Sequence, residues 1–160
     1  MNQLLHVSAS PHIKDRVTTS SIMLDVIIAL IPATLFGIIQ FKINALLIIV
    51  TTITTCVLAE YLYERFMKKT ITIKDLSAVV TGLILALNLP STVPLWLPII
   101  GGLFAIIVVK QFYGGLGQNF MNPALAARCF LLISFTGRMI NFAFDGMTSS
   151  TPLAILKNGE

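Results

Sequence analysis

Charged residues are scarce in this chain of 160 residues, with eleven Lys or Arg and seven Asp or Glu against 56% hydrophobic residues. A soluble domain needs many more polar side chains to keep its surface in water. The composition therefore excludes an ordinary soluble domain and predicts apolar segments that face lipid. The net charge of +4 comes from basic residues in short segments between apolar runs, so it forms no basic face for nucleic acid.

Cysteine and histidine are also rare, with two of each. Cys56 and Cys129 lie inside apolar runs without further ligands at metal-binding spacing, so we interpret both as packing residues and predict no metal site. His6 and His12 lie near the start of the chain, which leaves no arrangement of Ser or Cys with His for hydrolysis. Residues 1–16 lack the pattern of a secretory signal, and we expect no cleaved signal peptide.

Long apolar runs dominate the sequence, at residues 22–40, 43–63, 76–89, 94–109 and 122–135. The first two are close to the roughly 20 residues that a helix needs to cross hydrocarbon. The third is short and ends at Pro90. It is therefore either a plain span or a broken or re-entrant helix. We predict an all-α polytopic membrane protein with about five apolar helical segments. The third segment is either continuous or discontinuous.

Two of these runs contain local signals. Gly101 and Gly102 are small enough to let the fourth segment approach a neighbouring helix closely. Asn122 followed by Pro123 is typical of a helix start, with Asn as the N-cap and Pro at the first helical position.

Basic residues predict the orientation, because cytoplasmic loops carry an excess of Lys and Arg. Residues 1–21 and 64–75 are both expected inside, on the basis of Lys14, Arg16, Arg65, Lys68, Lys69 and Lys74. Counting onward, residues 110–121 are also inside, the membrane domain covers residues 22–135, and residues 136–160 form an extracytoplasmic tail. This count requires the short third run to cross.

Asp25 and Glu60 stand inside apolar runs, where an ionisable side chain is costly in lipid. Each lies near the predicted cytoplasmic end of its helix, so we interpret both as side chains that reach up to the membrane interface. A role in an ion pathway is the alternative hypothesis, and neutral isosteres of the two residues would test it.

The tail contains Thr151 and Pro152 before an apolar stretch, which is the pattern of a helix start with a threonine N-cap. A helix start also exposes free amide donors and the positive end of the helix dipole, and both favour a phosphate. From these residues alone, a simple cap and a phosphoryl attachment site both remain open.

Two blocks of sequence resemble a known family: residues 114–135, GGLGQNFMNPALAARCFLLISF, and residues 10–33, SPHIKDRVTTSSIMLDVIIALIPA. They are similar to the D subunits of Rnf-type electron-transport complexes and to the related B subunits of sodium-pumping NADH:quinone oxidoreductases. The resemblance runs from about Ser10 to the end of the chain.

The resemblance implies a covalent flavin. In that family a flavin transferase attaches FMN through its phosphate to a threonine, within the pattern Asp, two residues, Ser or Thr, two residues, Thr. The matching residues here are Asp145, Thr148 and the acceptor Thr151. Where the family usually has Gly and Ala before the acceptor, this chain has two serines, which add neighbouring hydroxyls.

The resemblance also implies architecture and partners. Family members have two inverted halves of a urea-transporter-like fold and about twice this length, so the chain looks like the N-terminal half. It is expected in a prokaryotic cell membrane beside the other subunits of an Rnf-type complex, which passes electrons between ferredoxin and NAD and moves sodium or protons. The GGLGQN segment is expected to be a tight cytoplasmic turn, and a contact with flavin or a partner stays open.

Two other function classes fit parts of the sequence. A small-solute channel or transporter would fit the broken third segment and the fold analogy, which is a weak basis for function. A structural membrane scaffold would fit the hydropathy alone. Neither accounts for the acceptor motif, and covalent flavin would separate both from the electron-transport interpretation.

Overall fold

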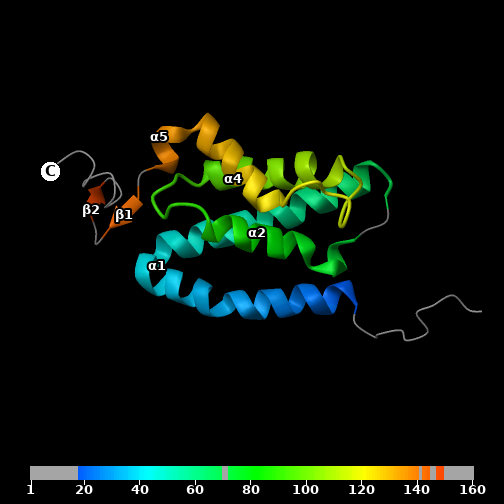
Figure 1. The fold of residues 1–160 in the computed structure, drawn as a ribbon, viewed down its shortest axis with the longest axis horizontal. Helices are drawn as coiled ribbons and strands as arrows, with labels where there is room; N and C mark the ends of the chain where they lie inside the picture. Colours follow the sequence, from blue (N-terminus) through cyan, green and yellow to red (C-terminus); the bar gives the residue numbers. More distant parts are fainter. Residues whose placement is uncertain (1–17, 70–71, 141, 145–146, 150–160) are drawn as a thin grey trace, which may run out of the picture.

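The computed structural model of the protein describes residues 18–69, 72–140, 142–144 and 147–149 (Figure 1). These residues form helices and one small hairpin, in the order α1 (Thr19–Phe66), the 3₁₀ turn η1 (Ile73–Asp75), α2 (Ser77–Leu87), α3 (Trp96–Leu103), the π-helix η2 (Phe104–Gln111), α4 (Pro123–Ser134), α5 (Thr136–Met139), β1 (Phe142–Phe144) and β2 (Met147–Ser149). Helix is therefore present in each of the five predicted apolar runs.

Helix α1 is a helical hairpin with two arms. Thr18 begins it with a reciprocal capping box, in which Thr18 and Ser21 each accept a hydrogen bond from the other's backbone N–H. Lys42 interrupts the helix at φ 54 and ψ −134, between the first two predicted runs. Figure 1 shows the arms running in opposite directions on either side of this turn. The two predicted spans are therefore present as separate arms.

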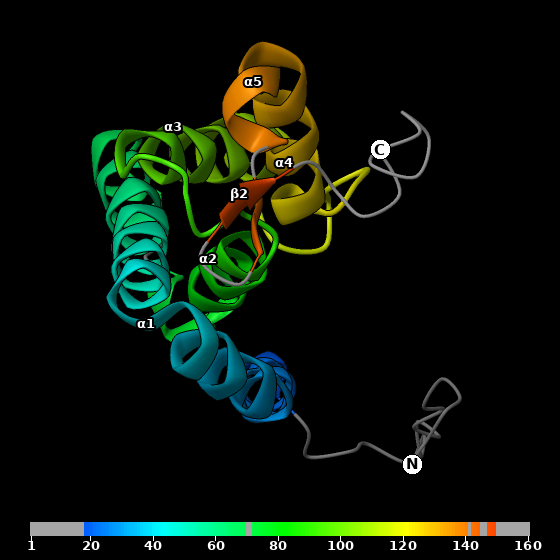
Figure 2. The same ribbon diagram turned by 90° about the vertical axis from the view of Figure 1, so that its left-hand side faces the viewer.

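The core lies between the second arm of α1 and helices α2, α3 and α4, which are arranged around it in Figure 2. Leu85, Leu97 and Leu131 have no exposed surface and join α2, α3 and α4. The first arm contributes little to this core, and its large apolar side chains are exposed, with Phe36 at 68% and Ile39 at 76%. An apolar surface of this kind suits lipid rather than water.

The later helices are shorter than a full membrane crossing. Among the described residues, only α1 is long and apolar enough by itself. At 1.5 Å per residue, the 11 residues of α2 extend about 16 Å, roughly half of the ~30 Å hydrocarbon core. This length fits the predicted broken or re-entrant third segment. Five full crossings and the inverted-repeat, urea-transporter-like architecture stay predictions.

The connections between helices alternate between the two ends of the molecule. The turn at Lys42, the connection from α2 to α3 and the hairpin of β1 and β2 lie at one end in Figure 1, and α1 begins at the other. The described residues are helical apart from this hairpin, in which Phe142 pairs with Ser149 and Phe144 with Met147. Two strands joined by a two-residue connection satisfy each other's backbone groups without a helix.

Close helix contacts depend on glycine, as the Gly101–Gly102 pair predicted. A Cβ added at Gly101 would lie 2.7 Å from Leu131 Cδ1 in α4, and one at Gly102 would lie 3.2 Å from Thr55 Cγ2 in α1. Gly82 of α2 lies directly against the backbone of α1, because its added Cβ would lie 2.9 Å from the Cα of Ile53. Helix α2 therefore packs against α1 backbone to backbone at this point.

We expect Gly82→Ala to lower the free energy of unfolding by about 1–3 kcal/mol, because the added methyl group meets backbone that has no rotamer to change. Titration with SDS in mild detergent, followed by circular dichroism, measures the change. Gly37→Ala is the matched control, since a Cβ there meets nothing within 4 Å. Equal stability of the two variants would contradict the packing at Gly82.

Candidate functional site

The predicted flavin motif is described only at its middle residue. Thr148 lies in β2, where it pairs with Ala143 of β1. Asp145 and Thr151 lie outside the described residues. β2 ends at Ser149, two positions before the predicted acceptor in the sequence.

A polar cluster is buried at the opposite end of the helices from the hairpin, where the second arm of α1, α2 and η2 meet. Lys110 Nζ lies 2.5 Å from Glu60 Oε1 and donates to Ser77 Oγ at 2.6 Å. Gln111 Nε2 donates to Glu60 Oε1 at 3.3 Å and to Glu64 Oε1 at 3.5 Å. All of these side chains are buried, and Glu60 has no exposed surface.

Local structure explains why these groups converge. Glu60 and Glu64 are one helical turn apart on the same face of α1. Lys110 and Gln111 end the π-helix η2, a wide turn that often occurs at functional sites. Both consecutive side chains point inward, so one short segment supplies an ammonium and an amide to the two carboxyl groups.

The cluster, defined as Glu60, Glu64, Thr72, Ser77, Lys110 and Gln111, has two carboxyl groups and one ammonium group. Thr72 Oγ1 contacts Glu60 Oε1 at 3.3 Å and also contacts Glu64 Oε1, although a hydroxyl has only one proton to donate. Glu60 Oε2 is buried and has no hydrogen-bond partner within the described part of the chain. One further proton or monovalent cation would balance the charge of this arrangement.

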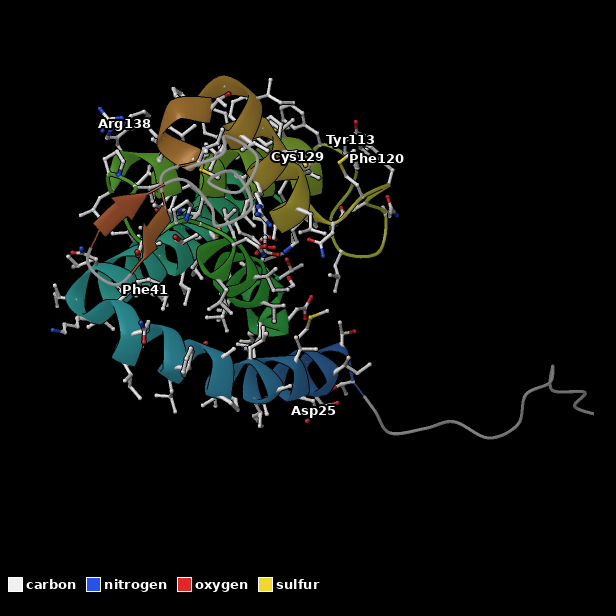
Figure 3. All side chains as sticks on the ribbon, turned by 60° about the vertical axis from the view of Figure 1, so that its left-hand side comes forward. Asp25, Phe41, Tyr113, Phe120, Cys129 and Arg138 are labelled. Carbon is white, nitrogen blue, oxygen red and sulfur yellow. The ribbon has the colours of Figure 1, made fainter. Side chains whose placement is uncertain are left out.

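This geometry corrects one interpretation from the sequence. Glu60 does not reach up to an interface, because it is fully buried and paired with Lys110. Asp25 is exposed and points away from the helices on the first arm of α1 (Figure 3), which fits the interface interpretation. The structure thus separates two acids that looked alike in the sequence.

Sequence reasoning missed Lys110 and Glu64 because both stand where an apolar run gives way to a polar segment. Charged side chains at such positions are usually solvated, and the charge pattern places Lys110 in a cytoplasmic loop. The one available indication was the spacing of Glu60 and Glu64, four residues apart beside a lysine that ends another apolar run.

The GGLGQN segment forms the tight turn that we predicted. Gly114, Gly115 and Gly117 have φ values of 111°, 102° and 86°, in the region that favours glycine. Asn122 then caps α4, since its Oδ1 accepts from Ala124 N at 3.0 Å and Leu125 N at 3.4 Å. The predicted helix start is confirmed.

The two cysteines differ. Cys56 is fully buried in the core, as predicted for a packing residue. Cys129 is exposed, and it lines an apolar pocket with Tyr113 and Phe120, which lie close together in Figure 3. The packing prediction is therefore wrong for Cys129, because this position of α4 faces outward.

A sequence profile of the NQR2, RnfD, RnfE family matches residues 6–160. The chain belongs to this family. The resemblance identified from the two sequence blocks is thus confirmed over nearly the whole chain, including both arms of α1 and the tail.

Individual relatives support the same family assignment. The chain is 50% identical to the D subunit of the Na(+)-translocating ferredoxin:NAD(+) oxidoreductase complex of Acetobacterium woodii, across 100% of this chain and 52% of that protein. It is 41% identical to the D subunit of the proton-translocating ferredoxin:NAD(+) oxidoreductase complex of Clostridium ljungdahlii, across 94% and 47%. It is also 42% identical to the D subunit of the ion-translocating oxidoreductase complex of Aliivibrio salmonicida, across 83% and 38%. The chain spans about half the length of these curated relatives.

Proposed function

We propose that this chain is the N-terminal, flavin-carrying half of a D-type subunit in an ion-translocating ferredoxin:NAD oxidoreductase complex. The observation that carries the proposal is 50% identity along the whole chain to a protein of that name. The subunit is not catalytic alone. It works in a prokaryotic cell membrane beside the other subunits of an Rnf-type complex, with its N-terminus cytoplasmic.

The electron-carrying role rests on FMN, joined through its phosphate to Thr151 by a flavin transferase, with Asp145 and Thr148 as the other motif residues. A flavin held in this way accepts and passes on one or two electrons, while the protein fixes its position and surroundings. The hairpin before Thr151 lies at the same end as the turn at Lys42, the end for which the charge pattern predicts an extracytoplasmic location. Family transferases act on that face.

The ion-coupling role rests on the buried cluster. The cluster has two carboxyl groups but only one ammonium group, and Glu60 Oε2 lacks a hydrogen-bond partner within the described residues. Buried charges within a membrane domain usually mark an ion or proton path. Glu60 therefore takes this role in the proposal, and the exposed Asp25 does not. Relatives named for sodium translocation and for proton translocation both match the chain, so the proposal keeps both sodium and protons as candidates for the transported ion.

A small-solute channel of the same architecture is the alternative, and the short helix α2 is the feature that favours it. A channel needs no covalent flavin, so flavin content separates the two functions.

The test is to express the chain with its family's flavin transferase, denature it and measure flavin fluorescence on the protein band. We expect fluorescence on the unsubstituted chain and none on Thr151→Ala, because only the hydroxyl of Thr151 forms the phosphoester. Thr148→Ala is the second variant, expected to reduce labelling without removing the acceptor. If a full-length relative treated in parallel carries flavin and this chain carries none, the flavoprotein role is rejected.

A further inference from the structure

The second arm of α1 carries an apolar stripe on its outer face. Leu58, Leu62 and Phe66 are each four residues apart, so they lie on one face of the helix. Their exposed fractions rise toward the end of the helix, from 53% and 62% to 87%. Large apolar side chains as exposed as these lie outside the core and are suited to contact with an acyl chain or another apolar surface.

The helix ends in a basic turn. Its last residues form a Schellman motif, in which Lys69 N donates to the carbonyl of Glu64 at 2.9 Å and Lys68 N donates to the carbonyl of Arg65 at 3.4 Å. Lys68 occupies the left-handed position of this motif with a φ of 53°, where glycine is usual. Lysine is a costly residue for this backbone conformation, so its presence points to a use for its charge.

Three basic residues at this end of α1 are exposed. They are Arg65, Lys68 and Lys69, here called the basic helix end. The one ion pair within the described residues joins Lys110 to Glu60, so none of the three has a carboxylate partner in that part of the chain. Glu64 lies next to them in sequence but turns its carboxyl group inward, where it accepts from Thr72. The outer surface at this end is therefore positively charged.

Aromatic rings border the basic helix end. Lys69 Nζ lies 5.1 Å from the centroid of the Tyr63 ring, and the centroids of Tyr63 and Phe112 are 6.3 Å apart. Phe112 and Phe66 are both exposed. Basic side chains mixed with aromatic rings at the end of an apolar helix are typical of the headgroup region of a membrane. A soluble acidic partner would match the charges but would leave the apolar stripe uncovered, whereas a lipid fits both.

We propose that this surface binds an anionic phospholipid, such as phosphatidylglycerol, with an acyl chain along Leu58, Leu62 and Phe66 and its phosphate at the basic helix end. Arginine and lysine donate charge-assisted hydrogen bonds to phosphate oxygens. Basic side chains at the membrane surface also attract anionic headgroups. The basic helix end therefore selects a lipid in addition to orienting the helix.

Fluorescence quenching by brominated lipids tests the site in the whole chain, reconstituted into phosphatidylcholine nanodiscs. Trp96 is the single tryptophan of the chain, so Phe66→Trp in a Trp96→Phe background reports on the stripe alone. We expect binding of brominated phosphatidylglycerol to be preferred over brominated phosphatidylcholine by roughly fivefold, and the preference to fall as salt is added. Phe36→Trp in the same background is the matched control, because Phe36 is exposed on the first arm. It should show no preference.

Charge variants test the basic helix end with the same probe. Arg65→Gln with Lys68→Gln removes two charges and leaves Lys69 over the Tyr63 ring, and it should remove most of the preference. Lys42→Gln with Arg138→Gln is the matched control, since both residues are exposed and belong to the end that carries the hairpin in Figure 1. It should leave the preference unchanged. Equal quenching by the two lipids at position 66, or a full preference after the first double substitution, would overturn the proposal.

Photo-cross-linking identifies the occupant of this surface in the assembled complex. Benzoylphenylalanine in place of Phe66 should form its cross-link with phosphatidylglycerol, detected as a mass increase on the peptide that contains residues 58–69. A cross-link to another subunit would show that a protein covers the surface and would overturn the proposal, as would the absence of any lipid cross-link.

Discussion

Replacing Lys110 with methionine is expected to lower the free energy of unfolding by about 3–5 kcal/mol. The substitution keeps an apolar stem of similar length but removes the ammonium group 2.5 Å from Glu60 Oε1. Glu60 and Glu64 would then share the interior without a cation, and Ser77 would lose its hydrogen-bond donor. A buried carboxylate that loses its partner has no water to replace it.

Titration with SDS measures the loss, and a double variant identifies its cause. Glu60→Gln with Lys110→Met removes both charges, and we expect it to recover most of the stability, because a buried ion pair can be replaced by neutral groups at little net change. Lys74→Met is the matched control, since Lys74 is exposed. A double variant as unstable as Lys110→Met would show that packing rather than unpaired charge causes the effect.

Under the proposed function, replacing Glu60 with glutamine is expected to abolish ion transport while electron transfer from ferredoxin to NAD continues. Glutamine keeps the shape of the side chain and an oxygen that accepts from Lys110, so the helices should remain packed. It removes the negative charge that would bind a passing cation or proton in the cluster. Electrons would still pass, because the flavin is expected at the opposite end of the helices.

Vesicles containing the assembled complex separate the two activities, with ion uptake measured beside NAD reduction. Asp25→Asn is the matched control: it removes one carboxylate from an exposed position on the first arm, and we expect ion uptake close to that of the unsubstituted complex. Uptake at the full rate in Glu60→Gln would exclude Glu60 from the ion path. A parallel loss of electron transfer would indicate a structural defect, which the SDS titration would detect.

Much of the helical framework could be predicted because it depends on local chemistry. Asn122 and Pro123 begin α4 as expected, since a side-chain cap acts on amides only two and three residues away. The break near residue 42 separates two runs that are each long enough to span lipid, and glycine at 114, 115 and 117 allows positive φ without help from distant residues. The short β-hairpin was missed because its pairing involves only six residues, too few for a periodic pattern.

The site divides in the same way. The flavin motif proposed at Asp145, Thr148 and Thr151 could be predicted from sequence by resemblance, because its spacing is local, and it stays a prediction. The buried polar cluster could not be predicted, since Glu60 and Lys110 are 50 positions apart and meet only when η2 packs against the second arm of α1.

The sequence by itself determined that this protein is helical, apolar and suited to lipid, because too few charged residues exist to keep it in water. It also determined the family, through motifs that persist in linear order. Only the tertiary structure decided that Glu60 is buried against Lys110 while Asp25 is exposed. Both acids occur near the ends of apolar runs, and whether an acid is solvated or paired depends on which distant side chain the packed helices bring to it.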